Sequence, residues 1–170
     1  MTHRHVAVID IGKTNVKLAL VRASELSEVA TSTRPNTVLP GPPYPHFDVD
    51  GHWAFILDGL ARFQGEHGLS AITVTTHGAA AALIGADGAL AAPILDYEHR
   101  GPEDTAEAYE AIRPPFAETG SPRLAMGLNL GAQLFWQFAT DPGLKDRLAQ
   151  IVTYPQFWAH RLAGIFTTDV

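Results

Sequence analysis

The chain has 170 residues, about the length of one domain, and 46% of them are hydrophobic, which argues against a disordered chain. Twelve Lys and Arg against 18 Asp and Glu give a net charge of −6 at pH 7, so the chain is a poor non-specific binder of nucleic acid or of an anionic membrane. The absence of cysteine excludes disulfides and thiolate catalysis, and no apolar run is long enough to span a membrane. A cytoplasmic protein is therefore the default expectation.

The first quarter of the chain predicts three strands. Residues 5–11 (HVAVIDI) form a mostly apolar, β-branched run that is typical of a strand buried on both faces. Residues 16–22 and 29–33 predict two more strands, and the short polar break at 12–15 indicates an antiparallel hairpin. Five prolines between residues 35 and 45 then predict an extended loop.

A helix is predicted from about residue 51 to 65, with Asp50 as its cap. Its apolar stripe is expected to consist of Trp53, Ile56, Leu57, Leu60 and Gln64. Residues 71–76 (AITVTT) and 79–84 predict two further strands. The sequence Gly85-Ala86-Asp87-Gly88 then predicts a hairpin turn, with a returning strand at 89–95.

The last third of the chain predicts mainly helices, at about 103–112, 131–139 and 143–149. A short strand at 151–153 and a final helix follow. The apolar stripe of the final helix is expected to be Tyr154, Phe157, Trp158 and Leu162, with Gly164 just after its end. The order of elements indicates an α/β fold in which helices flank a mixed, five-stranded sheet.

Asp10 is the first candidate for a functional role, because burial of an unpaired carboxylate in an apolar strand is costly. It lies near the carboxyl end of its strand, where α/β sheets bind ligands. It either faces a site, where it could hold a hydrated Mg²⁺, or caps the amides of the following turn.

The turn Gly12-Lys13-Thr14 resembles part of a phosphate-binding loop, but the spacing of a Walker A motif is missing and a strand follows where that motif needs a helix. The alternative is a β-hairpin whose turn amides, with the side chains of Thr14 and Asn15, meet phosphate oxygens. An ordinary polar turn with a solvated Lys13 is the simpler interpretation.

Two further polar groups follow predicted strands. His77-Gly78 could bind a hydroxyl group and let a ligand approach the backbone, or His77 is an ordinary packed histidine. The run Asp96-Tyr97-Glu98-His99-Arg100 could recognise a polyhydroxy substrate, or it is a solvated loop in which Arg100 pairs with Glu98 or Asp96.

Two other patterns have simpler explanations. The alternating His46, Asp48, Asp50 and His52 could suggest a metal site, but Asp50 is better used as a helix cap and no metal motif has this spacing. Several aromatic residues occur at helical spacing and are expected in the core rather than stacked on bases. They are Phe135, Trp136, Phe138, Phe157 and Trp158.

Three blocks of the sequence, taken together, resemble the carbohydrate kinases known by the signature FGGY, members of the actin-like, ribonuclease H-like ATPase superfamily. VAVIDIGKTNVKLALV resembles their phosphate-binding hairpin. ITVTTHGAAAALIGADGALAAPILDYEHR is similar to their next block, and TYPQFWAHRLAG to a later proline-bearing helix. The blocks follow in the family's order across nearly the whole chain. Asp96-Tyr97 and the two threonines before His77 favour the rhamnulose- and fuculose-kinase side over xylulose kinases.

The resemblance implies roles for individual residues. Asp10 would hold Mg²⁺ through water. The residues implied to approach the phosphates of ATP are Gly12, Lys13, Thr14 and Asn15. Those implied to contact or organise the sugar pocket are Thr76, His77, Gly78, Glu98 and Arg100.

The resemblance also implies ATP-dependent phosphorylation of a ketose or related polyol, with ATP and Mg²⁺ as cofactors and an aspartate base beyond residue 170. Residues 1–170 would then be a truncated N-terminal kinase domain, without the second domain and inactive alone. A small-molecule sugar is the expected partner, nucleic acid and membranes are not expected, and a homo-oligomer is left open. The alternative is a non-catalytic sugar- or nucleotide-binding module with the same half-fold. A chaperone-like or cytoskeletal ATPase is disfavoured by the triplet Thr76-His77-Gly78 and by the polar run at residues 96–100.

Overall fold

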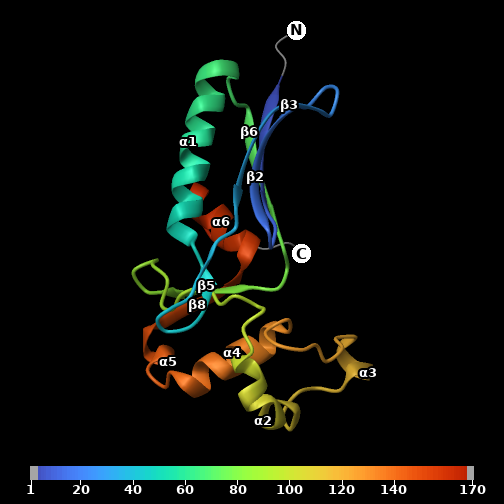
Figure 1. Ribbon diagram of the computed structural model, residues 1–170, viewed down its shortest axis with the longest axis vertical. Helices are drawn as coiled ribbons and strands as arrows, with labels where there is room; N and C mark the ends of the chain where they lie inside the picture. The colour runs from blue at the N-terminus through green and yellow to red at the C-terminus, as the bar shows by residue number, and fades with distance from the viewer. Residues whose placement is uncertain (1–3, 168–170) are drawn as a thin grey trace. The chain divides into compact units, whose positions relative to one another are not determined.

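The computed structural model describes residues 4–167, which form two compact units. The first unit contains residues up to 38, residues 48–78 and the chain from 155 onward. The second contains residues 39–47 and 79–154. Both strands and helices contribute, so the predicted α/β class is confirmed (Figure 1).

The first unit is built on a four-stranded mixed sheet in the order β3-β2-β1-β6. Strand β1 (His5–Ile11) pairs antiparallel with β2 (Asn15–Arg22), and β2 pairs antiparallel with β3 (Ser27–Pro35). Strand β6 (Ala71–Thr76) lies parallel to β1 on its other side. The predicted hairpin and the three strands after residue 4 are therefore confirmed.

Helix α1 (Val49–His67) covers one face of this sheet, close to β1 and β2 (Figure 1). The burial of strand β1 therefore alternates along the chain. Ala7, Ile9 and Ile11 are buried, whereas the positions between them are more accessible and Asp10 is exposed. The prediction that residues 5–11 are buried on both faces is thus wrong for the face that carries Asp10. Among residues 4–167, helix α1 covers the face of the strand that carries Ala7, Ile9 and Ile11.

Helix α1 starts two residues earlier than predicted, and its cap is Asp48 rather than Asp50. An Asp48 carboxylate oxygen accepts a hydrogen bond of 3.0 Å from the backbone N–H of Gly51, and Asp50 lies in the first turn. The buried stripe also differs from the prediction: Leu57 is 45% exposed, while Phe63 is fully buried. The buried residues of the helix are Val49, His52, Ile56, Gly59, Leu60 and Phe63.

Helix α6 (Tyr154–Ala163) supplies aromatic side chains that pack on α1 within the first unit. The Trp158 ring stacks on His52 with centroids 6.3 Å apart, and the Arg161 guanidinium lies 4.8 Å from the centre of the Trp53 ring. Phe157 and Trp158 are buried, as predicted, and Gly164 adopts φ +73° directly after the helix. The predicted final helix is confirmed.

The second unit contains the strand pair that the sequence placed wrongly. Strand β7 (Ala81–Gly85) pairs antiparallel with β8 (Leu148–Thr153), so it forms a separate two-stranded sheet and is not a fifth strand of the main sheet. The first four residues of β7 are all buried, which shows that it packs on both sides. The predicted five-stranded sheet is therefore corrected to four strands.

The predicted turn at 85–88 is present, with a hydrogen bond of 3.0 Å from Gly88 N–H to the Gly85 carbonyl. The returning strand at 89–95 is not: this segment makes only isolated bridges, from Leu90 to Ile84 and from Leu95 to His46. The proline loop ends differently from the prediction as well, since β4 (Val38–Leu39) and β5 (His46–Phe47) form a small sheet.

The remaining elements of the second unit are short helices. They are η1 (Gly101–Thr105), α2 (Ala106–Glu110), α3 (Phe116–Thr119), α4 (Leu130–Thr140) and α5 (Leu144–Arg147). The predicted helix 143–149 ends at Arg147, because the chain turns into β8 at Leu148. None of the helices among the described residues is long and apolar enough to cross a membrane.

The core of the second unit surrounds Tyr44, which packs with Leu95 and Trp136. The Tyr44 hydroxyl donates to the Pro93 carbonyl at 2.7 Å and accepts from the Gln137 amide at 2.8 Å. Burial raises the pKa of Tyr44 to about 12, so the hydroxyl remains neutral.

Candidate functional site

The turn between β1 and β2 is a tight polar hairpin at the end of the sheet. The backbone N–H of Gly12 donates to the carbonyl of Asn15 at 2.9 Å and closes the turn. Thr14 and Asn15 are exposed, while Gly12 and Lys13 are half-buried. The turn therefore presents two polar side chains to solvent, as its sequence predicts for a ligand-binding or an ordinary polar turn.

Asn36, which the sequence analysis did not single out, holds this turn from the side. Its side-chain N–H donates to the Gly12 carbonyl at 2.7 Å, and its backbone N–H donates to the Thr14 carbonyl at 2.9 Å. The residue directly follows β3 and is 8% exposed. Both turn carbonyls are thereby satisfied, which leaves the rest of the turn free to face outward. A lone Asn after a proline carries no sequence signal for this role.

His52 on helix α1 completes the arrangement. Its Nε2 lies 2.7 Å from the side-chain oxygen of Asn36. Because the Asn36 nitrogen faces the Gly12 carbonyl, its oxygen can only accept, and His52 Nε2 must donate. His52 is fully buried, and burial, with a smaller contribution from the Arg34 charge, lowers its pKa to about 4. The imidazole is therefore neutral near pH 7. Through His52 and Asn36, hydrogen bonds connect helix α1 to the hairpin.

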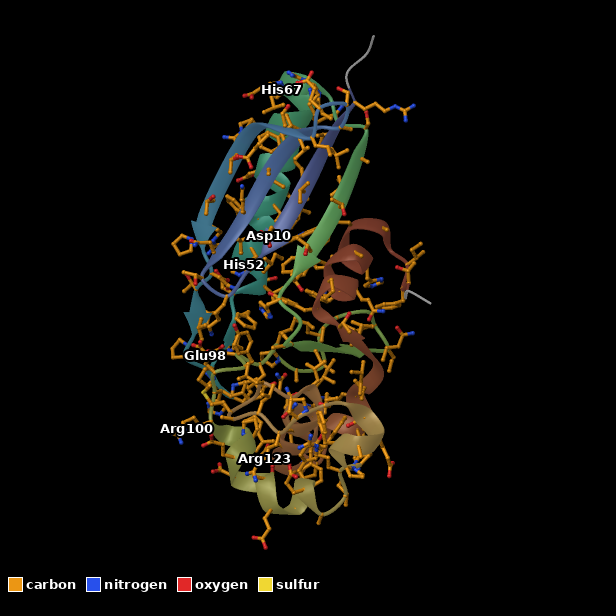
Figure 2. The ribbon with its side chains drawn as sticks, turned by 90° about the vertical axis from the view of Figure 1, so that its right-hand side faces the viewer. Asp10, His52, His67, Glu98, Arg100 and Arg123 are labelled. Carbon is orange, nitrogen blue, oxygen red and sulfur yellow. The ribbon has the colours of Figure 1, made fainter. Side chains whose placement is uncertain are left out.

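Asp10 lies on the open face of the sheet, close to the hairpin (Figure 2). In the sheet register it stands opposite Lys17 on β2 and Thr75 on β6, so these three residues share one face. Its carboxylate is exposed, which corrects the expectation that it is buried in an apolar strand. The cost of burying a charge is therefore no longer an argument for a functional role of Asp10. An accessible carboxylate is nevertheless suited to bind a ligand.

The carboxyl ends of β1 and β6 lie side by side, as parallel neighbours do. The backbone N–H of His77 donates to the Ile11 carbonyl at 3.0 Å, which joins the residue after β6 to the last residue of β1. The residues predicted for phosphate and those predicted for sugar at 76–78 are thus brought to one edge of the sheet. This placement required a parallel pairing that the sequence alone did not specify.

Packing explains only part of the triplet Thr76-His77-Gly78 at the end of β6. The Thr76 hydroxyl donates to the His77 carbonyl at 2.8 Å, and His77 is half-buried. Gly78 is exposed, and a Cβ added there would meet no atom within 4 Å. The fold therefore does not demand glycine at position 78, which is compatible with a need for space beside the triplet.

Glu98 and Arg100 belong to the second unit, in the turn after Leu95. Both are exposed, and the Glu98 backbone N–H donates to a carboxylate oxygen of Asp96 at 3.2 Å. Arg100 forms its ion pair with Glu103, at 2.9 Å, rather than with Glu98 or Asp96 as the simpler sequence interpretation expects. Asp96 itself is buried, and its backbone N–H donates to the Pro45 carbonyl.

The alternating His and Asp residues at 46–52 have separate structural roles. Asp48 caps α1 and pairs with Arg34 at 2.9 Å, and the hydrogen bonds from Gly51 and Arg34 lower its pKa although burial alone would raise it. Asp50 pairs with Arg161 at 3.7 Å, and His52 binds Asn36. No group of three His, Cys, Asp or Glu side chains within residues 4–167 could hold a metal ion.

A protein site for Mg²⁺ with a nucleotide usually provides one or two carboxylates, and water and phosphate oxygens complete the shell. Asp10 supplies one accessible carboxylate, and the exposed hairpin beside it supplies polar groups. The donor set therefore fits a hydrated Mg²⁺ that accompanies a phosphate, and does not fit a metal held by the protein alone.

Comparisons with solved structures identify similar chains. A carbohydrate kinase from Novosphingobium aromaticivorans is 34% identical, with a TM-score of 0.90, and the match covers 100% of this chain and 36% of that one. Xylulose kinase from Rhodospirillum rubrum is 25% identical, with a TM-score of 0.75 over 98% of this chain and 36% of that one. This chain thus spans about a third of the length of both structures. No family model and no curated protein matches it.

A more distant structure extends the likeness of the fold alone. Glycerol kinase from Plasmodium falciparum, solved with ADP, is 11% identical, with a TM-score of 0.75 over 95% of this chain and 35% of that one. The arrangement of elements is therefore retained where the sequence is not.

Proposed function

This chain belongs to the carbohydrate kinases of the FGGY type, with their actin-like fold, and from that premise we propose that it forms the nucleotide-phosphate site and part of the sugar site of an ATP-dependent sugar kinase. The observation that carries the proposal is the hydrogen bond of 3.0 Å from His77 N–H to the Ile11 carbonyl. It joins the two strand ends that bear the predicted phosphate and sugar residues.

On the phosphate side, Asp10 holds a hydrated Mg²⁺, and backbone and side chains of the hairpin contact the phosphates. The hairpin residues assigned to this role are Gly12, Lys13, Thr14 and Asn15. Support comes from the accessibility of Asp10 and from Asn36, which satisfies the turn carbonyls from behind. When bound, Mg·ATP supplies the phosphoryl group and the metal neutralises its charge.

On the sugar side, the residues of the first unit assigned to contact the sugar are Thr76, His77 and Gly78. Glu98 and Arg100 of the second unit are assigned to substrate recognition from the sequence resemblance. Hydroxyl groups of a ketose or polyol offer donors and acceptors that imidazole, carboxylate and guanidinium groups can match. The open space at Gly78 supports a close approach of the substrate to the backbone.

The transfer itself needs a base that accepts the proton of the attacking hydroxyl. Because the chain spans 36% of the kinases it matches, we place this base, and the second domain, outside residues 1–170. The chain is then part of an N-terminal kinase domain and transfers no phosphate alone. A cytoplasmic location and the absence of nucleic-acid or membrane partners stay predictions, and a homo-oligomer stays open.

Amide NMR of the chain tests the binding proposal. Mg·ATP should shift the amide signals of Gly12, Thr14 and Asn15, and a ketose such as D-xylulose or L-rhamnulose should shift those of His77 and Gly78. The variant Asp10→Asn should remove the effect of Mg²⁺ on the ATP shifts but leave the ketose shifts unchanged. Asp58→Asn, an exposed aspartate on α1, is the matched control.

Unchanged hairpin signals at millimolar Mg·ATP would contradict the phosphate site, and unchanged signals at 77–78 with both ketoses would contradict the sugar site. Robust sugar phosphorylation by the chain would show that the base lies within it. Binding of both ligands without transfer, even by the longer protein, would favour the alternative of a non-catalytic binding module.

A further inference from the structure

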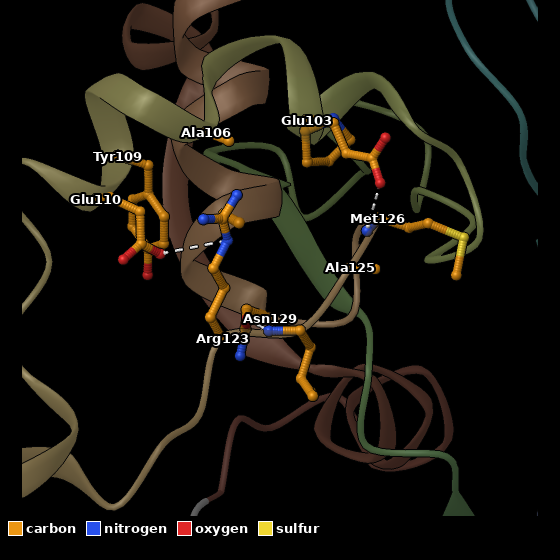
Figure 3. Close-up of a pocket in the computed structure, with 11 residues that line it drawn as sticks. Glu103, Ala106, Tyr109, Glu110, Arg123, Ala125, Met126 and Asn129 are labelled. Carbon is orange, nitrogen blue, oxygen red and sulfur yellow. Dashed lines mark hydrogen bonds and ion pairs between the residues drawn. The ribbon is translucent and has the colours of Figure 1, made fainter.

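The second unit contains a cavity that the proposed kinase site does not use. Its volume is about 440 Å³, and it lies between η1, α2, the start of α4 and the loop before α4 (Figure 3). Apolar side chains of Ala106, Ala125 and Met126 line it, and Glu103, Glu110 and Arg123 contribute the charged groups. None of these residues is assigned to the phosphates or to the sugar.

The loop wall of this cavity is held in place by specific hydrogen bonds. The Asn129 side chain accepts from the Leu124 N–H at 2.8 Å and donates to the Pro122 carbonyl at 3.1 Å. The Met126 N–H donates to a carboxylate oxygen of Glu103 on η1 at 3.2 Å, which connects the loop to η1 (Figure 3). Met126 also adopts φ +54°, a conformation that costs a residue other than glycine about 1 kcal/mol or more. The wall is therefore preformed.

The charges of the cavity leave one arginine weakly paired. Glu103 pairs with Arg100 at 2.9 Å, and Glu110 pairs with Arg113, also at 2.9 Å. Arg123 approaches the same Glu110 oxygen only to 3.9 Å, beyond hydrogen-bond distance, and its side chain is 66% exposed. In these ion pairs three guanidinium groups share two carboxylates, and Arg123 makes the longest contact.

We propose that this cavity binds an organic anion, with its carboxylate or phosphate group on Arg123 and a small apolar body against Ala106, Ala125 and Met126. A guanidinium recognises either group through two parallel hydrogen bonds, and it gains more from such a partner than from Glu110 at 3.9 Å. The two carboxylates are already neutralised by Arg100 and Arg113, so they do not repel the ligand strongly.

Methionine-methyl NMR tests this site with little ambiguity, because the chain contains only two methionines, Met1 and Met126. The protein is labelled with methyl-¹³C methionine, and Met126→Leu identifies the Met126 signal. Benzoate and phenyl phosphate are the probes, with neutral benzamide and inorganic phosphate as controls. We expect saturable shifts of the Met126 signal with at least one of the two probes, and much weaker effects of benzamide and inorganic phosphate.

Charge variants then assign the contact. Arg123→Gln should weaken probe binding about tenfold or more, because one charge-assisted pair is lost. Glu110→Gln should strengthen probe binding several-fold, because Arg123 then no longer pairs with the exposed Glu110 carboxylate. Arg147→Gln is the matched control, since Arg147 is another exposed arginine paired with one carboxylate, Asp141.

Each possible result supports or contradicts the proposed anion site. If neither probe shifts Met126 at millimolar concentration, the site does not exist. Equal responses to benzoate and benzamide, or unchanged affinity in Arg123→Gln, would overturn the assignment of an anion. A response to phenyl phosphate but not to benzoate would restrict the ligand to phosphate esters, and the reverse would restrict it to carboxylates.

Discussion

At the scale of single residues, the hairpin depends on two polar side chains that lie behind it. The Asn36 side-chain amide donates to the Gly12 carbonyl and accepts from His52 Nε2, so both ends of this buried amide are hydrogen-bonded. Removing Asn36 would leave the His52 donor unpaired, which costs about 1–3 kcal/mol for a buried group. The shape of the turn is thus coupled to helix α1.

His52 gives the first prediction. Its pKa of about 4 in the folded chain lies below the ordinary value of 6.5, so between these pH values the unfolded state binds more protons. The stability linked to His52 is complete above pH 6.5 and is lost as the pH falls towards 4. The variant His52→Gln keeps a donor for Asn36 but cannot titrate. When the pH is lowered from 7 to 4.5, the free energy of unfolding of the variant should therefore fall by about 2–3 kcal/mol less than that of the wild type.

Urea unfolding at the two pH values measures this difference. Arg34 and Asp48 are the charged groups that act on His52, and both are retained in the variant. A variant whose free energy of unfolding falls as steeply as that of the wild type would show that His52 is protonated in the folded state.

At the scale of elements, two glycines of α1 show where the helix touches the sheet. A Cβ added at Gly59 would lie 2.3 Å from a methyl carbon of Leu18, which is fully buried on β2. A Cβ added at Gly65, six residues later on the same helix, would meet nothing within 4 Å. The same residue type thus serves a close packing contact at one position and no contact at the other.

The second prediction compares alanine at these positions. Gly59→Ala should destabilise the chain by about 1–3 kcal/mol through overpacking against Leu18, reduced by the gain in helix propensity. Gly65→Ala should stabilise it by about 0.5–1 kcal/mol, because only the propensity changes. Thermal and urea unfolding of the two variants give the free energies. Equal effects would mean that Leu18 moves aside without cost.

At the scale of the whole molecule, β6 is an edge of the four-stranded sheet, and its outer side has no strand partner among the described residues. Ile72 on this strand is 43% exposed, and Ala71, Thr73 and Thr75 are exposed as well. Unpaired edges with apolar side chains favour pairing with another chain. The chain should therefore self-associate as its concentration rises.

The third prediction places a charge on this edge. Ile72→Lys should lower the weight-average mass seen in sedimentation at high concentration, because a lysine opposes strand pairing. Leu26→Lys, at a position 85% exposed in the turn between β2 and β3, is the matched control and should leave association unchanged. Association that both variants reduce equally would point to general charge repulsion rather than to β6.

The sequence alone determined the hairpin, the strand at 71–76 and the aromatic helix at the end, because each has a clear local period or turn signal. It misplaced the cap of α1, since two aspartates two residues apart have equal local propensity and only the contact of Asp48 with Arg34 and Gly51 separates them.

The tertiary structure alone decided three other features. It paired β7 with β8, which lie more than 60 residues apart in the chain, it placed Asp10 on an open face, and it brought Asn36 and His52 to the hairpin. These features depend on which strands meet and on which face a helix covers, and such long-range contacts leave no periodicity in the residues that make them.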